Sequence, residues 1–159
     1  MRDDSQHQKD LDLSVDSEVL GEALFGTAAR IVRSHERREK WSALAALEAQ
    51  TMKRLDEYLS ASAQSGSAGA AARFRGQAMG VMFALLPWRA AMKALGDGTA
   101  RYLAAFRRLE TGAQSELDRS FFEYLVAHEV AIRDFAQAEL SGASEGSLAP
   151  IHALLRASG

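Results

Sequence analysis

The feature that most constrains the fold is a run of apolar side chains at helical spacing between Arg37 and Leu59. At about 100° per residue, these apolar residues fall within one narrow arc: Trp41, Ala45, Met52, Leu55 and Leu59. Such a stripe is typical of an amphipathic helix that buries one face against neighbouring helices. Glu48 lies at the centre of the arc, so we expect the helix to bury a carboxylate among its apolar residues.

Apolar residues at the same spacing predict three further long helices, over residues 15–33, 99–111 and 120–140. A tight turn near Ser34 and a short loop after Gly112 then produce two helical hairpins. The intervening residues, about 60–98, form a long crossover with its own helix over 70–86. Pro87 ends or kinks that helix, and Gly96-Asp97-Gly98 stops the two helical turns that follow.

No stretch of the sequence shows the alternation typical of a strand. The expected fold class is therefore all-α, an antiparallel four-helix bundle built from two helical hairpins with a long helical crossover. The chain has 159 residues, which suits one domain, and we assign that domain to residues 15–157. It includes a short last helix with Pro150 in its first turn. Residues 1–14 are polar without a period and are expected to be a disordered leader.

Composition excludes several classes of function. The chain has no cysteine, which rules out disulfides, zinc–thiolate sites, iron–sulfur clusters and cysteine nucleophiles. A net charge of −2 gives no basic face for nucleic acid. No apolar run approaches the roughly 20 residues that cross a bilayer, and the first residues do not resemble a signal peptide. We expect a cytoplasmic protein that binds neither nucleic acid nor membrane.

Two polar residues interrupt the apolar stripe of the segment 120–140, which contains Phe121, Leu125, Ile132 and Phe135. His128 lies about 40° to one side of the stripe centre and Glu129 about 60° to the other. A buried carboxylate such as that of Glu48 must be paired, protonated or bound to a cation. A hydrogen bond between Glu48 and His128 would satisfy both without a metal; a shared metal ion is the alternative.

The hairpin–crossover–hairpin layout, with Glu48 and Glu129 directed inward, resembles the ferritin-like superfamily. Di-iron bundles of that family place one Glu on each of two helices and a Glu-x-x-His motif on each of the other two. The resemblance implies iron or manganese as cofactor, and an oxidase, peroxidase or iron-binding activity. It makes four residues the candidate metal ligands: Glu22, Glu48, His128 and Glu129.

The chain departs from that motif at both histidine positions. Three residues after Glu48 stands Thr51, and three residues after Glu129 stands Ile132. Glu22, on the first helix, lies nearly opposite that helix's main stripe, formed by Leu20, Leu24, Thr27 and Ile31. A complete di-iron site cannot be assembled, which leaves a single ion held by some of the four candidates, or a site that has lost its metal.

The crossover is rich in methionine and aromatic residues, namely Phe74, Met79, Met82, Phe83, Trp88 and Met92. Such a cluster is typical of a core, but it also suits a homodimer contact or an apolar ligand. The function expected first is a non-enzymatic or vestigial-site bundle that serves as an interaction or ligand-binding protein, and a homodimer. The alternatives are a metal carboxylate protein and a binder of a small apolar ligand through the crossover.

Overall fold

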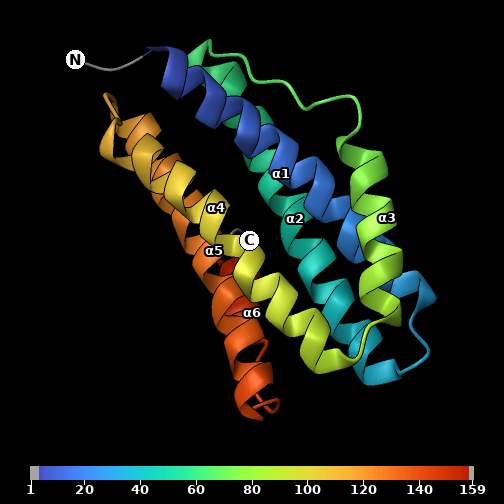
Figure 1. The fold of residues 1–159 in the computed structure, drawn as a ribbon. Helices are drawn as coiled ribbons and strands as arrows, with labels where there is room; N and C mark the ends of the chain where they lie inside the picture. Colours follow the sequence, from blue (N-terminus) through green and yellow to red (C-terminus); the bar gives the residue numbers. More distant parts are fainter. Residues whose placement is uncertain (1–3, 158–159) are drawn as a thin grey trace.

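The computed structural model describes residues 4–157, and this part of the chain is built from helices without strands (Figure 1). The all-α prediction is confirmed. The six helices are α1 (Asp4–Ile31), α2 (His35–Ser62), α3 (Ala72–Leu85), α4 (Trp88–Thr111), α5 (Glu116–Ser141) and α6 (Ala149–Arg156). Within residues 4–157, none is long and apolar enough to cross a bilayer.

The four longest helices contact one another in a cycle. α1 packs against α2, α2 against α5, α5 against α4, and α4 against α1. α3 lies on the outer side of α1, while α6 packs against α5 and α2 (Figure 1). An ion pair of 2.7 Å joins Asp10, near the start of α1, to Arg108, near the end of α4, so these two helices run antiparallel.

Helix ends follow the local signals in the sequence. The Ser34 side chain accepts a hydrogen bond from the backbone N–H of Arg37 and caps α2. Ser115 and Asp118 form a reciprocal capping box at the start of α5. Pro87 separates α3 from α4, and Pro150 lies in the first turn of α6. The expectations from the sequence at Ser34, Pro87 and Pro150 agree with the structure, while α5 begins at Glu116, four residues before the expected start.

The first helix starts at Asp4, whereas the sequence pattern predicts a start near Val15 and a disordered leader over residues 1–14. Residues 4–14 are helical because their inner face is buried. Leu11 is 1% exposed and packs with Leu55 and Phe122, and the Ser14 hydroxyl donates to the Leu11 carbonyl. Residues 1–3 of the expected leader lie outside the described residues.

Helix α4 also differs from the expectation, because it continues through Gly96-Asp97-Gly98 without a break. Each glycine costs a helix about 1 kcal/mol relative to alanine, but packing on both sides of the triplet holds the backbone helical. Met92 and Leu95 are buried before it, and Leu103 after it. The crossover therefore ends at Pro87, not near residue 98.

Helix α1 is buried on two faces, and the predicted main stripe faces α3 instead of the interior. A Cβ added at Gly80 of α3 would lie 2.5 Å from the Leu24 carbonyl oxygen and 2.7 Å from the Thr27 Cβ. Gly76 approaches the Leu20 carbonyl in the same way. These glycines let the two helices pack closely, which leaves the other face of α1 for α2, α4 and α5.

Candidate metal centre

Three polar side chains from three helices meet in the interior. Glu18 comes from α1, Glu48 from α2 and His128 from α5, and they are 1%, 4% and 1% exposed. Each offers one oxygen or nitrogen atom, and these three atoms lie within 4.8 Å of one another. In the part of the chain that the structure describes, this is the group of acidic and imidazole side chains with the spacing of a metal site.

The inner face of α1 explains how Glu18 reaches this point. Its buried residues recur with alternating steps of three and four, a spacing that keeps them on one side of a helix: Leu11, Ser14, Glu18, Gly21 and Phe25. Gly21 then makes room for Glu48, because a Cβ at Gly21 would lie 2.7 Å from the Glu48 carboxyl carbon. The small residue on α1 thus places the α2 carboxylate beside Glu18.

The imidazole of His128 lies between the two carboxylates without bonding to either. Its Nδ1 is 3.9 Å from Glu18 Oε1, and its Nε2 is 3.6 Å from Glu48 Oε2. Both ring nitrogens and Glu18 Oε2 are buried and have no hydrogen-bond partner within residues 4–157. Buried polar atoms in proteins are nearly always satisfied, so an imidazole with two unsatisfied nitrogens beside an unsatisfied carboxyl oxygen indicates a missing partner.

Burial changes the protonation of the carboxyl groups. It raises the pKa of Glu18 well above its ordinary value, and the neighbouring Glu48 raises it further. Burial likewise raises the pKa of Glu48 to about 8. The two side chains share a hydrogen bond that raises the pKa of Glu18 and lowers that of Glu48. Glu18 is therefore the donor in this hydrogen bond and Glu48 is the acceptor.

The structure separates the four candidates predicted from the sequence. It brings Glu48 and His128 together, and it places Glu129 at the wall of the same cavity, 5% exposed. Burial raises the pKa of Glu129 to about 8. Glu22 does not join the group, since its side chain is 41% exposed and lies 4.0 Å from Arg73 of α3.

Glu18 is a ligand candidate that the sequence pattern does not reveal. A helix that begins near Val15 has Glu18 in its first turn, where an acid interacts favourably with the helix end. The spacing of Leu11, Glu18 and Phe25, seven residues apart, was the available signal. It becomes visible only when the helix is extended back to Asp4.

Thr51 and Ile132 occupy the positions at which a di-iron motif carries its histidines. The Thr51 hydroxyl donates to the Leu47 carbonyl and lies 2.8 Å from the Tyr124 hydroxyl, so it is committed to bonds within the core. Ile132 is 3% exposed and offers no ligand atom. The candidate centre therefore offers donor atoms enough for one ion and lacks the histidines that would complete a pair.

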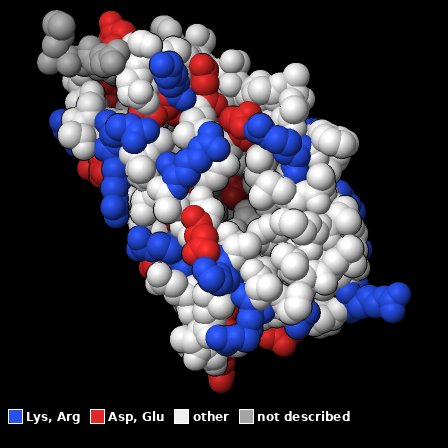
Figure 2. Space-filling view, in the orientation of Figure 1, with Lys and Arg blue, Asp and Glu red and all other residues white. Residues whose placement is uncertain are grey.

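A cavity of about 460 Å³ adjoins the three side chains. Its wall includes residues of α1, α3, α4 and α5 together with Glu48 of α2. Figure 2 shows a hollow at the centre of the visible face, with acidic atoms at its bottom and basic side chains near its opening. The candidate centre is thus buried but open to a small molecule.

Comparison with known proteins adds no relative, because no protein-family model, curated protein or solved structure matches the chain. Any functional conclusion therefore depends on the chemistry of the residues themselves.

Proposed function

We propose that the protein binds a single divalent first-row transition metal ion through Glu18, Glu48 and His128. The observation that carries this proposal is the imidazole of His128, whose two buried nitrogens lie between two carboxylates and bond to neither. A metal ion would satisfy an imidazole nitrogen and the free oxygen of Glu18 together. No rearrangement of helices is needed, because one ligand atom from each of the three side chains already lies within 4.8 Å of the others.

The donor set fits such an ion. Bonds of about 2.0–2.2 Å to a shared ion require ligand atoms about 3–4 Å apart, slightly closer than the 4.8 Å limit within which these atoms lie. Side-chain rotation can supply this contraction. Two ionised carboxylates balance the charge of a divalent cation, and an imidazole favours iron or zinc over magnesium or calcium. Carboxylates extend the choice to manganese, so iron and manganese remain the ions to test first.

We further propose that the cycle of four long helices is a ferritin-like bundle whose metal site is reduced from two ions to one. The packing of α1, α2, α5 and α4 supports this arrangement. Thr51 and Ile132 support the reduction, because neither offers a nitrogen ligand. Once bound, the ion would supply Lewis-acid or redox chemistry. The protein would supply a buried environment and, in Glu129, a neighbouring carboxyl that holds a proton near neutral pH.

Elemental analysis tests this proposal. The protein, purified after growth with iron and manganese and also titrated with each ion and with zinc, is expected to hold one ion per chain. Glu48→Gln keeps the shape of the side chain but removes the charge, so it is expected to lose the ion. Glu57→Gln is the matched control, because it alters an exposed acid on the same helix. A native protein that holds no metal under any of these conditions would favour the vestigial, non-enzymatic interpretation.

The outer face of α3 supports a second proposal, that two copies of the chain associate through it. Phe74 and Leu85 are 73% and 75% exposed, and Met82 between them is 46% exposed. The opposite face of this helix is packed on α1. Light scattering coupled to size exclusion is expected to give a dimer that Leu85→Glu dissociates and Gln77→Glu does not. A native monomer at micromolar concentration would contradict the proposal.

A further inference from the structure

The cavity beside the candidate metal centre has a polar end and an apolar end. On α1 its lining begins with Asp16 and Glu18 and continues with Leu24 and Phe25. α3 runs in the same direction as α1, since Arg75 is bonded to Asp16 and Gly80 packs on Leu24. Its lining residues follow the same order, with Arg75 first and two apolar residues after it, Met79 and Phe83.

Along α4 the apolar lining residues come first and the polar ones last, because α4 runs antiparallel to α1. Its lining residues begin with Ala94 and Leu95 and end with Arg101 and Tyr102. The polar residues of three helices therefore share one end of the cavity, and the apolar residues share the other, where Ile132 of α5 adds to them. A ligand that fits both ends has one polar group and an apolar body.

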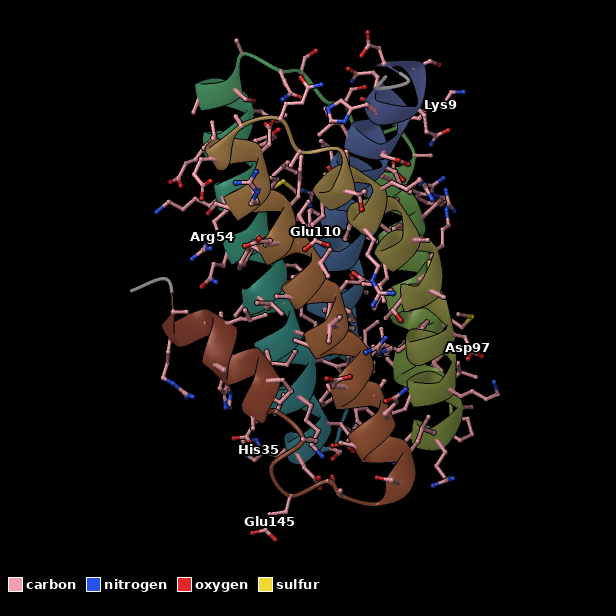
Figure 3. All side chains as sticks on the ribbon, turned by 90° about the vertical axis from the view of Figure 1, so that its left-hand side faces the viewer. Lys9, His35, Arg54, Asp97, Glu110 and Glu145 are labelled. Atoms are coloured by element: carbon pink, nitrogen blue, oxygen red, sulfur yellow. The ribbon has the colours of Figure 1, made fainter. Side chains whose placement is uncertain are left out.

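The charged side chains at the polar end of the cavity determine which polar group a ligand should carry. Asp16 is neutralised by Arg75 at 2.6 Å, and Asp97, which points away from the bundle in Figure 3, is bonded to Lys93 at 2.7 Å. Arg101 also lines the cavity, and no acid within residues 4–157 forms an ion pair with it. It rests near the Tyr102 ring, 5.8 Å from its centre. Arg101 is thus the rim charge left for a ligand.

We infer that the cavity binds a medium-chain fatty carboxylate, with the hydrocarbon chain between Leu24, Phe83 and Leu95 and the carboxylate at Arg101. The volume of about 460 Å³ lies within the range of roughly 300–1,000 Å³ found for small-molecule pockets. An arginine binds a carboxylate with two parallel hydrogen bonds. The inner acids are ligands of the proposed ion, so the choice of an anionic head group rests on the proposed function.

Calorimetric titration with decanoate tests the inference, on chelator-treated protein and on metal-loaded protein whose metal content is measured separately. We expect decanoate to bind the metal-loaded protein, and the chelator-treated protein more weakly, with affinity rising about fourfold for each added CH₂ from hexanoate to decanoate. The metal content tests the proposed metal site, and decanoate binding tests the proposed ligand cavity. The failure of one proposal can therefore be told apart from the failure of the other. Decanoate that binds neither form would overturn the inference, as would tighter binding of decylammonium.

Two variants locate the ligand. Gly98 lines the cavity, and nothing lies within 4 Å of a Cβ added there, so Gly98→Leu is expected to fill the cavity and abolish binding while the protein stays folded. Ala100→Leu is its control, at an exposed position outside the cavity. Arg101→Gln is expected to weaken decanoate about tenfold and leave 1-decanol unchanged, whereas Arg107→Gln changes neither. Unchanged decanoate binding in Gly98→Leu, with native circular dichroism, would overturn the assignment.

Discussion

Two groups of buried charged residues differ in how completely they are satisfied. In the first, Lys40 of α2 lies 2.8 Å from Glu139 of α5, and the indole N–H of Trp88 donates to the same carboxylate at 2.7 Å. The Ser147 hydroxyl donates to it as well. In the second, His128 lies between Glu18 and Glu48 and has no hydrogen-bond partner among the described residues.

Protonation follows this difference. Burial opposes ionisation of Glu139, but hydrogen bonds from Lys40, Ser147 and Trp88 outweigh it and lower the pKa. Burial prevails at Glu48 and raises the pKa to about 8. A satisfied pair joins α2 to α5 and needs nothing more. The group around His128 is different, because buried polar atoms in it still lack hydrogen-bond partners in the described part of the chain. Gly21 leaves room beside Glu48, and a bound ligand would supply the missing partners, as expected of a binding site.

The largest predicted effect is an opposite pH dependence of the two groups. Folded, metal-free protein retains a proton on Glu48 up to about pH 8, whereas the unfolded chain releases it near 4.5. The free energy of unfolding should therefore fall by about 5 kcal/mol as the pH rises through this window. Glu139, with its lowered pKa, loses its contribution only as the pH falls below 4.5. Urea denaturation from pH 3 to pH 9 measures both; Glu48→Gln should make the alkaline side shallower, and the raised pKa of Glu129 accounts for part of the slope that remains.

Breaking the satisfied pair is expected to have the next largest effect. Lys40→Met leaves Glu139 buried without its cation and should lower the free energy of unfolding by about 3 kcal/mol at pH 7. Lys53→Met, which breaks an exposed pair with Glu57 at 4.0 Å, is the control and should leave stability nearly unchanged. Metal content should be normal in both variants. Loss of metal in Lys40→Met with native circular dichroism would contradict the separation of the two groups.

Metal addition should act on the second group alone. At a free concentration a hundred times the dissociation constant, an ion bound to the folded state adds about 2.7 kcal/mol of stability. We expect thermal unfolding to shift upward with iron(II) or manganese in the native protein and in Lys40→Met. His128→Phe should show no shift, because it removes the nitrogen ligand. A shift of equal size in His128→Phe would mean that the ion binds elsewhere.

Most helix boundaries could be predicted because they depend on local chemistry. Ser34, Ser115 and Pro87 act within one turn of their own positions, and the sequence displays these signals directly. The start of α1 and the continuity of α4 could not be predicted in this way. Leu11 is held by Leu55 and Phe122, which are distant in sequence, and such contacts override weak local preferences.

The candidate site could be predicted only in part, because some of its residues are placed by contacts that are distant in sequence. Glu48 lies at the centre of a clear stripe and could be identified as buried from its own helix. Glu18 lies on the face of α1 opposite its main apolar stripe, together with Leu11 and Phe25, and packing of α3 decides which of the two faces the interior. Because α3 packs on the main stripe through Gly76 and Gly80, the residues of the opposite face line the centre. Glu22, one turn later, turns outward.

The smallest predicted effect concerns the residue that makes room for the centre. Gly21→Ala places a Cβ 2.7 Å from the Glu48 carboxyl carbon, so the carboxylate must move. We expect the free energy of unfolding to fall by about 1–2 kcal/mol and metal affinity to weaken. Gly26→Ala is the matched control on α1, since its nearest side-chain atom is 3.8 Å away, and the gain in helix propensity should stabilise it slightly. Equal metal affinity in the two variants would mean that Glu48 does not need its present position to bind the ion.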